Sequence, residues 1–465
     1  MKNFCRQVGA KDAVVFSVFG QNFLFSASSL TYFPITDCAA ELILNDFTDE
    51  KFLKSLESKF SQKEIFLTVN KIREFYDKKI ICERKNYSKG EIFYNDYHLK
   101  LVQSTRCNLN CSYCFSKKDS SFDMSVETAK KAILFFVEKF VPDKNRRIIV
   151  DLTGSGEPLV RFDFVIEVNK FVLELKKKLN LNIFCQLATN GMLLSKEKSD
   201  LMKKSGILFG VSLDGNKEKT EKNRCGLNYD LVSKNIFDIE NKDFFGLAST
   251  YSGNNYDFVE IFKSLAVFKP EVIGMKPVRL LESDLNSVNM NNIEEIKKSY
   301  EKFLKWIYKQ LVGGRKDYFE MFIKSEDFLV RFLKITLRPF RVFYRCSSVV
   351  NSFAVDSKEN ILICPAFVGK KEGVIGNLEN GIEPGMKKKF EALYADKISW
   401  CKNCWARYTC AGECFAVGFS NFGIFERPSK AMCELKKFLI QLSVYFWTCL
   451  RFEHEDLYQQ LLQRF

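Results

Sequence analysis

The stretch Cys107-Asn-Leu-Asn-Cys111-Ser-Tyr-Cys114-Phe115 follows directly after an apolar run at residues 99–102 that predicts a β-strand. Three thiolates at the spacing C-x3-C-x2-C can bind three irons of a cubane 4Fe–4S cluster and leave the fourth iron without a protein ligand. A structural zinc site is the alternative, but it takes four protein ligands, and His98 lies nine residues upstream on the strand. The stretch therefore predicts an iron–sulfur site at the end of a strand.

Strand-like and helix-like segments alternate from about residue 98 to residue 313. A helix follows each predicted strand, and Ser125 is placed to cap the first helix. The strands are predicted at residues 99–102, 148–152, 183–188, 208–213, 245–250 and 272–278. Six βα repeats predict an α/β fold in which a parallel sheet curls into a partial (β/α)6 barrel. Active sites in such folds lie beyond the C-terminal ends of the strands.

Small and polar residues follow three of these strands at that end. The segment Thr153-Gly-Ser-Gly-Glu-Pro-Leu159 combines glycines, which let a ligand approach the backbone, with the anionic side chain of Glu157. Thr189-Asn190-Gly191 and Ser212-Leu-Asp214-Gly215 follow the next two strands. The guanidinium of Arg224 suits a carboxylate, although a surface arginine is the plainer interpretation. Beside the three cysteines, these segments indicate a ligand site rather than ordinary turns.

Taken together, the motifs resemble the signature of the radical S-adenosylmethionine (SAM) superfamily. The resemblance implies that Cys107, Cys111 and Cys114 hold a 4Fe–4S cluster whose open iron chelates SAM. Reductive cleavage of SAM would release a 5′-deoxyadenosyl radical that abstracts a hydrogen from the substrate. Ser155 stands in place of the first glycine of the family's Gly-Gly-Glu-Pro motif, which binds the amino group of SAM. The implied SAM contacts are Tyr113, Ser155, Gly156, Glu157, Asn190, Ser212 and Arg224.

Seven further cysteines follow the predicted barrel, at positions 346, 364, 401, 404, 410, 414 and 433. Four of them, in Cys401-x2-Cys404 and Cys410-x3-Cys414, would pass for a zinc module if read alone. The order of all seven resembles the SPASM domain of peptide-modifying radical SAM enzymes. That resemblance implies two auxiliary 4Fe–4S clusters, one held by Cys401, Cys404, Cys410 and Cys433, the other by Cys346, Cys364 and Cys414.

Two positions depart from the SPASM pattern. Glu359 stands where the family commonly has glycine before the second cysteine, so the turn there is expected to be built differently. Ser352 stands where some relatives have an extra cysteine. The first auxiliary cluster would then keep an open iron that binds a substrate thiolate, or take another residue as its fourth ligand.

The N-terminal segment predicts a small α+β unit. Strands are predicted at residues 14–18, 23–25 and 30–33, with a turn at Gly20-Gln21-Asn22, and helical periodicity follows. The unit resembles the winged-helix-like precursor-peptide recognition element of ribosomal peptide maturases, although a capping domain is the alternative. The expected domains are therefore residues 1–90 (peptide recognition), 95–313 (radical SAM barrel), 314–345 (bridging helices), 346–440 (SPASM) and 441–465 (C-terminal helix).

Composition narrows the function further. The net charge of +14 fits a solvated lysine-rich surface or an acidic partner, and nothing beyond charge points to nucleic acid. No apolar run is long enough to cross a bilayer. Ten of the sixteen cysteines fall in the clusters above, and without a signal peptide they predict metal ligands in a reducing cytoplasm. The leading hypothesis is thioether crosslinking of a ribosomally made precursor peptide, with electrons from a small carrier protein. Carbon–carbon crosslinking, epimerisation, formylglycine formation in sulfatases and a zinc-stabilised nucleic-acid-binding protein are the alternatives.

Overall fold

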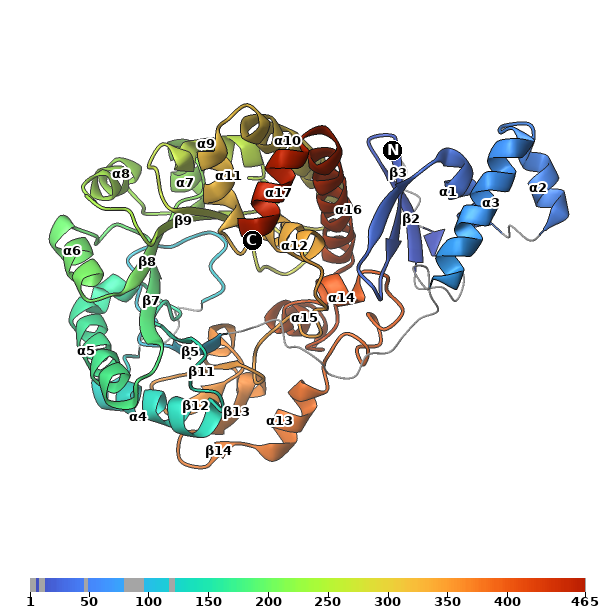
Figure 1. Ribbon diagram of the computed structural model, residues 1–465. Helices are drawn as coiled ribbons and strands as arrows, with labels where there is room; N and C mark the ends of the chain where they lie inside the picture. Colours follow the sequence, from blue (N-terminus) through green and yellow to red (C-terminus); the bar gives the residue numbers. More distant parts are fainter. Residues whose placement is uncertain (1–5, 8–12, 46–48, 79–95, 117–121, 465) are drawn as a thin grey trace.

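Six parallel strands form the core of the barrel in the computed structural model, which describes residues 6–7, 13–45, 49–78, 96–116 and 122–464 (Figure 1). They run side by side in sequence order within a ten-stranded sheet. Their bounds are β5 (Tyr97–Leu101), β6 (Ile148–Asp151), β7 (Ile183–Thr189), β8 (Leu208–Ser212), β9 (Phe245–Tyr251) and β10 (Val272–Pro277). The predicted partial barrel of six βα units is confirmed.

Helices cover the outside of the barrel (Figure 1). Ser125 caps the first of them, as predicted, because its hydroxyl accepts a hydrogen bond from the amide of Thr128. Residues along β7 and β9 alternate between buried and half-buried, which separates a face under the helices from a face toward the barrel interior. The helices are α4 (Val126–Phe135), the π-helix η1 (Phe136–Phe140), the 3₁₀ helix η2 (Pro158–Arg161), α5 (Phe162–Leu179), α6 (Lys196–Lys204), α7 (Lys217–Asn223), α8 (Tyr229–Phe237), α9 (Phe258–Ala266) and α10 (Ile293–Val312).

The cysteine-rich region continues the barrel sheet, which the sequence did not predict. Strand β11 (Ser352–Val355) pairs in parallel with β5, and β12 (Asn360–Leu362), β13 (Val374–Asn377) and β14 (Gly381–Ile382) follow in antiparallel order. Glu359, between β11 and β12, has a left-handed φ of 63°, a conformation that suits glycine. The turn therefore has a glycine-like backbone despite the glutamate.

The remaining helices connect and cover this extension. They are α11 (Lys316–Ile323), α12 (Phe328–Leu337), the 3₁₀ helices η3 (Pro365–Phe367) and η4 (Lys371–Gly373), α13 (Pro384–Glu391), α14 (Arg407–Cys410), α15 (Phe415–Phe422), α16 (Lys430–Glu453) and α17 (Glu455–Arg464). The single final helix expected at residues 441–465 is wrong. Ser429 caps α16 by accepting a hydrogen bond from the amide of Met432, so the helix begins earlier. His454, whose φ of −143° and ψ of 57° are not helical, separates α16 from α17. None of the helices in the described ranges is long and apolar enough to cross a membrane.

The N-terminal unit has the predicted three-stranded arrangement with one short strand added. Its sheet has the order β1 (Arg6–Gln7), β2 (Ala13–Val18), β3 (Gln21–Ser26) and β4 (Tyr32–Ile35), and α1 (Asp37–Leu44), α2 (Glu50–Leu56) and α3 (Gln62–Asp77) follow. The turn is one residue earlier than expected, because Phe19 and Gly20 take the positive φ angles while Gln21 and Asn22 belong to β3. The stretch Ser88-Lys89-Gly90, whose small and polar residues favour a linker, lies outside the described residues.

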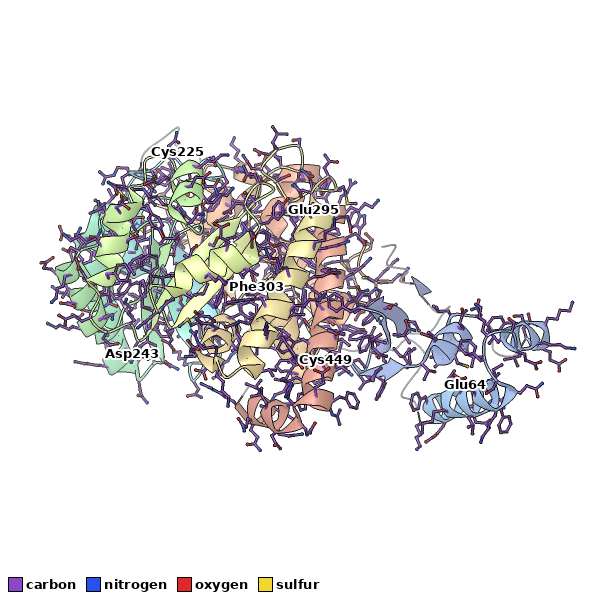
Figure 2. All side chains as sticks on the ribbon, turned by 90° about the horizontal axis from the view of Figure 1, so that it is seen from above. Glu64, Cys225, Asp243, Glu295, Phe303 and Cys449 are labelled. Atoms are coloured by element: carbon purple, nitrogen blue, oxygen red, sulfur yellow. The ribbon has the colours of Figure 1, made fainter. Side chains whose placement is uncertain are left out.

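Both faces of this N-terminal sheet are covered. Ala13, Val15 and Leu24 pack in a core with residues of α1 and α3. The opposite face belongs to the main core of the protein, where the ring of Trp405 meets Phe16 and Phe25 at centroid distances of 6.2 Å and 5.5 Å. Figure 2 shows the unit projecting from the body beside α16, on which Cys449 lies. The sheet therefore joins the recognition-like unit to the cysteine-rich region through an apolar contact.

We expect Phe25→Ala to destabilise this junction by about 3–5 kcal/mol, because a buried aromatic side chain leaves a cavity. Phe25 is 1% exposed. Amide hydrogen exchange in β2 and β3 would measure the loss. Phe66→Ala on α3 is the control, since Phe66 is 66% exposed, and its effect should stay within about 0.5 kcal/mol. Equal protection of these amides from exchange in the two variants would contradict the contribution of Phe25 to the junction.

Candidate functional site

The loop before the first three cysteines packs directly on the loop that follows β6. The amide of Glu157 donates to the carbonyl oxygen of Arg106 at 2.9 Å. A Cβ atom on Gly156 would lie 2.2 Å from that same oxygen, so glycine alone fits there. The segment predicted to bind SAM and the segment that carries Cys107 are therefore in backbone contact.

Glu157 holds the end of β7 against these two loops. Its carboxylate is buried and accepts hydrogen bonds from the Thr189 hydroxyl at 2.6 Å, the Asn190 amide at 2.8 Å and the Leu159 amide at 3.0 Å. Burial raises the pKa of Glu157, and these bonds oppose that rise. The side chain of Asn190 in turn donates to Asn108, inside the cysteine loop, at 2.8 Å. Asn108 is a contact that the sequence interpretation missed.

The end of β8 reaches the same cysteine loop through a buried carboxylate. Ser212 is the last residue of β8, and Asp214 beyond it is fully buried. Asp214 accepts hydrogen bonds from the Tyr113 hydroxyl at 2.6 Å and from the Arg224 guanidinium at 3.0 Å. Arg224 is buried, so the surface interpretation is wrong for this residue. Its nearest partner in the structure is Asp214, and Asp214 therefore fixes both Tyr113 and Arg224.

The donor set at this end of the barrel fits SAM and a cluster. Cys107 and Cys111 are half-buried and Cys114 is exposed, which leaves the three thiols open toward a ligand. Burial raises the pKa of Cys111 to about 11, so its thiol must lose a proton when it binds iron. Within the described ranges, two buried donors here, Nδ2 of Asn223 and Nε of Arg224, have no acceptor. A carboxylate such as that of SAM would satisfy them.

The structure also gathers the C-terminal cysteines into the two predicted sets. Burial raises the pKa of Cys364 to about 12, and the neighbouring thiolates of Cys414 and Cys346 contribute to the rise. Arg279, beyond β10, has an exposed side chain, and the charges of Cys414, Cys364 and Cys346 raise its pKa. Arg279 is a site residue that no sequence motif indicated.

The second set lies at the start of α16. Burial raises the pKa of Cys401, and the thiolates of Cys410, Cys433 and Cys404 raise it further. Across the described ranges, no three His, Cys, Asp or Glu side chains converge on the position of a single metal ion. The cysteines of a 4Fe–4S cluster each bind a different iron, so they need not converge on one point.

Serine hydroxyls tie the first set to the barrel. Ser352 is fully buried in β11 and its hydroxyl lies 3.0 Å from that of Ser347. Ser155 donates to the carbonyl oxygen of Pro365, the residue after Cys364, at 3.2 Å. The first auxiliary set therefore lies against the loop that is predicted to bind SAM.

A buried ion pair connects the two C-terminal sets. The ammonium of Lys436 donates to Glu413 at 2.8 Å and to the carbonyl oxygen of Gly412 at 3.0 Å. Glu413 also accepts from the amide of Cys414, while Lys436 lies three residues after Cys433 on α16. Burial raises the pKa of Glu413, but the charge and hydrogen bond of Lys436, the amide of Cys414 and the charge of Arg345 together outweigh burial, so the net shift is downward.

Lys436→Met should destabilise the protein by about 3–5 kcal/mol, because it leaves a buried carboxylate without its counter-ion. The two side chains are 2% and 4% exposed. Denaturant unfolding of the anaerobically purified protein would measure the change. Lys437→Met is the control, since Lys437 is 32% exposed and its ion pair with Glu434 lies at the surface, where such pairs contribute about 0–1 kcal/mol. Similar losses in both variants would contradict the importance of the buried pair.

Comparison with known proteins agrees with this geometry. Residues 101–248 match the Radical SAM superfamily. The radical SAM cyclopropyl synthase TigE of Paramaledivibacter caminithermalis is 21% identical over 86% of this chain and 87% of its own. The structure of anSMEcpe with bound AdoMet matches 75% of this chain and 96% of its own, with a TM-score of 0.60 and 18% identity. Streptococcus suis SuiB bound to the precursor peptide SuiA matches 89% of this chain and 96% of its own, with a TM-score of 0.52 and 14% identity. Residues 101–248 are therefore a radical SAM domain, and the chain is an enzyme with SAM and iron–sulfur clusters as its cofactors.

Proposed function

We propose that this enzyme modifies a ribosomally synthesised precursor peptide and closes a thioether crosslink in it. This proposal rests mainly on one observation. An N-terminal strand–helix unit, the barrel and the two C-terminal cysteine sets share one continuous hydrophobic core. We assign residues 1–90 to peptide recognition, 95–313 to the radical SAM barrel, and 346–440 to auxiliary clusters, with residues 314–345 as a helical support. A cytoplasmic location fits this dependence on reduced cysteines.

Residues at the ends of the barrel strands would hold the first cluster and SAM. Cys107, Cys111 and Cys114 would hold the first cluster, and Tyr113, Ser155, Gly156, Glu157, Asn190, Ser212 and Arg224 would surround SAM. When both are bound, the cluster and SAM supply a 5′-deoxyadenosyl radical for hydrogen abstraction. Asp214 orients Tyr113 and Arg224, and Glu157 keeps the loops around them closed.

Peptide recognition is proposed at an edge of the N-terminal sheet. Since both faces of this sheet are covered, its free hydrogen-bonding groups lie at the edge strands. An extended leader peptide can add to such an edge through main-chain hydrogen bonds. The net charge of +14 favours an acidic leader and an acidic electron-carrier protein, such as a small flavin or iron–sulfur protein.

The thioether chemistry is supported by the first auxiliary set. Three cysteines, Cys346, Cys364 and Cys414, lie together, and Ser352 occupies the position where some relatives have a further cysteine. The Ser352 hydroxyl is engaged with Ser347 inside the sheet. A cluster with three protein ligands leaves room for the thiol of a substrate cysteine.

Carbon–carbon bond formation is a second candidate, because the cyclopropyl synthase TigE matches 86% of this chain and 87% of its own. Formylglycine formation is a third, since a cysteine-type anaerobic sulfatase-maturating enzyme of Clostridium perfringens is 26% identical over 67% of this chain. The N-terminal unit favours the leader-dependent reactions over the third.

Iron analysis tests the cluster assignment. After anaerobic reconstitution we expect about twelve irons per chain, four for each cluster, with release of 5′-deoxyadenosine on reduction. Cys111→Ala should lose one cluster and SAM cleavage, whereas Cys364→Ala should lose one cluster and keep cleavage. Cys185→Ala, at a buried thiol in β7 outside all three sets, should keep every iron. About four irons per chain in the wild-type protein would contradict the assignment of the two auxiliary clusters.

Mass spectrometry tests the bond. A cysteine-containing precursor peptide encoded beside the gene should lose two hydrogens, and its cysteine should then resist alkylation by iodoacetamide. The leader-free core peptide should react far more slowly. The same mass loss with a cysteine that still alkylates would establish a carbon–carbon bond, and an aldehyde in place of the cysteine would establish formylglycine. Either of these products would refute the thioether.

A further inference from the structure

A row of three polar side chains crosses the inner wall of the barrel. In the registers of β5, β6 and β7, Lys100 lies beside Asp151 and Asp151 lies beside Gln186. Residues that are paired across neighbouring strands point to the same face of a sheet. All three are half-buried, whereas their neighbours Leu99 and Val150 are fully buried on the helix-covered face. The row therefore faces the barrel interior.

Asp151 is the one acidic residue within β5 to β10, all of which the structure describes. Its Oδ1 accepts the amide of Thr153 at 2.9 Å and its Oδ2 accepts the side chain of Gln186 at 3.3 Å. Neither partner carries a charge. The other two carboxylates near the site already have strong partners. Glu157 accepts three hydrogen bonds, and Asp214 forms an ion pair with Arg224. Two uncharged donors thus fix the orientation of the Asp151 carboxylate.

Asp151 lies between the loop predicted to bind SAM and the first auxiliary set. It lies two residues before Thr153, where the loop predicted to bind SAM begins. On its other side, Lys100 acts electrostatically on Cys364 of the first auxiliary set. Within the described part of the chain, the Lys100 ammonium forms no hydrogen bond or ion pair that would neutralise it. Ser155 bridges the same two regions through Pro365.

We propose that Asp151 is the proton acceptor for peptide oxidation and that Lys100 positions the reacting residue beside it through an anionic or carbonyl oxygen. This inference rests on the proposed function. Joining a thiol S–H and a C–H into an S–C bond releases one hydrogen atom, one proton and one electron. The hydrogen atom goes to the 5′-deoxyadenosyl radical, and the electron goes to the iron–sulfur cluster at Cys346, Cys364 and Cys414. The Asp151 carboxylate takes the proton, which balances the reaction. A carbon–carbon bond formed from two C–H groups releases the same three species.

Asp151→Asn tests the role, because asparagine keeps the shape and can still accept the Thr153 amide. The probe is the uniformly deuterated precursor peptide that the wild-type enzyme modifies. We expect the turnover number for crosslinked product to fall by about 10²–10⁴-fold, the contribution typical of a general base. Iron content and transfer of deuterium into 5′-deoxyadenosine should stay unchanged, because the abstracted hydrogen atom goes to the radical and not to Asp151.

Asp163→Asn is the matched control, since Asp163 is an exposed carboxylate in the first turn of α5. It should keep full crosslinking, and Asp151→Glu should recover part of the activity. Crosslinking by Asp151→Asn within threefold of wild type would overturn the inference. Loss of deuterium transfer together with product would also overturn it, because Asp151 would then only support the loop at Thr153. A wild-type enzyme that modifies no peptide would refute the proposed function, and this inference with it.

Discussion

The parallel pairing of β11 with β5 is the constraint on which the rest of the structure depends. It places Ser352 beside His98 and Val355 beside Leu101, so a segment from the last third of the chain completes the wall of the barrel. The strand β5 leads to Cys107, and β11 follows Cys346. One set of backbone hydrogen bonds therefore brings the start of the radical SAM loop and the start of the auxiliary region to neighbouring strands. The contact between Ser155 and Pro365 adds a second link at the strand ends.

Two buried ion pairs lie beside the cysteines. Asp214 with Arg224 lies beside Tyr113, and Glu413 with Lys436 lies beside Cys414. Burying such groups costs free energy unless they are paired, and each pair here is also hydrogen-bonded to a cysteine loop or its neighbour. The pairs stabilise loop shapes that apolar packing would leave undefined. Rigid loops are what a cluster with several distant ligands needs before it binds.

Periodicity and spacing predicted the parts of this protein that depend on local sequence. The six barrel strands follow from apolar runs, and Ser125 caps α4 because its hydroxyl reaches the third amide beyond it. The parallel β5–β11 pair was not predicted, because nothing local distinguishes β11 from an isolated strand. Arg224 was assigned to SAM or to the surface, whereas its pairing with Asp214 depends on a loop ten residues away folding back. The surroundings of Arg279 and Asp151 are formed by residues distant in sequence, so no local motif could predict them.

Trp405 makes the N-terminal unit hard to separate from the catalytic body. This side chain follows Cys404 directly and is 5% exposed, because Phe16 and Phe25 cover it. A descendant that lost its first ninety residues would present a bare indole ring and the flank of α16 to water. Such a loss would favour aggregation until the exposed positions had become polar. The N-terminal unit therefore also shields part of the cysteine-rich region from water.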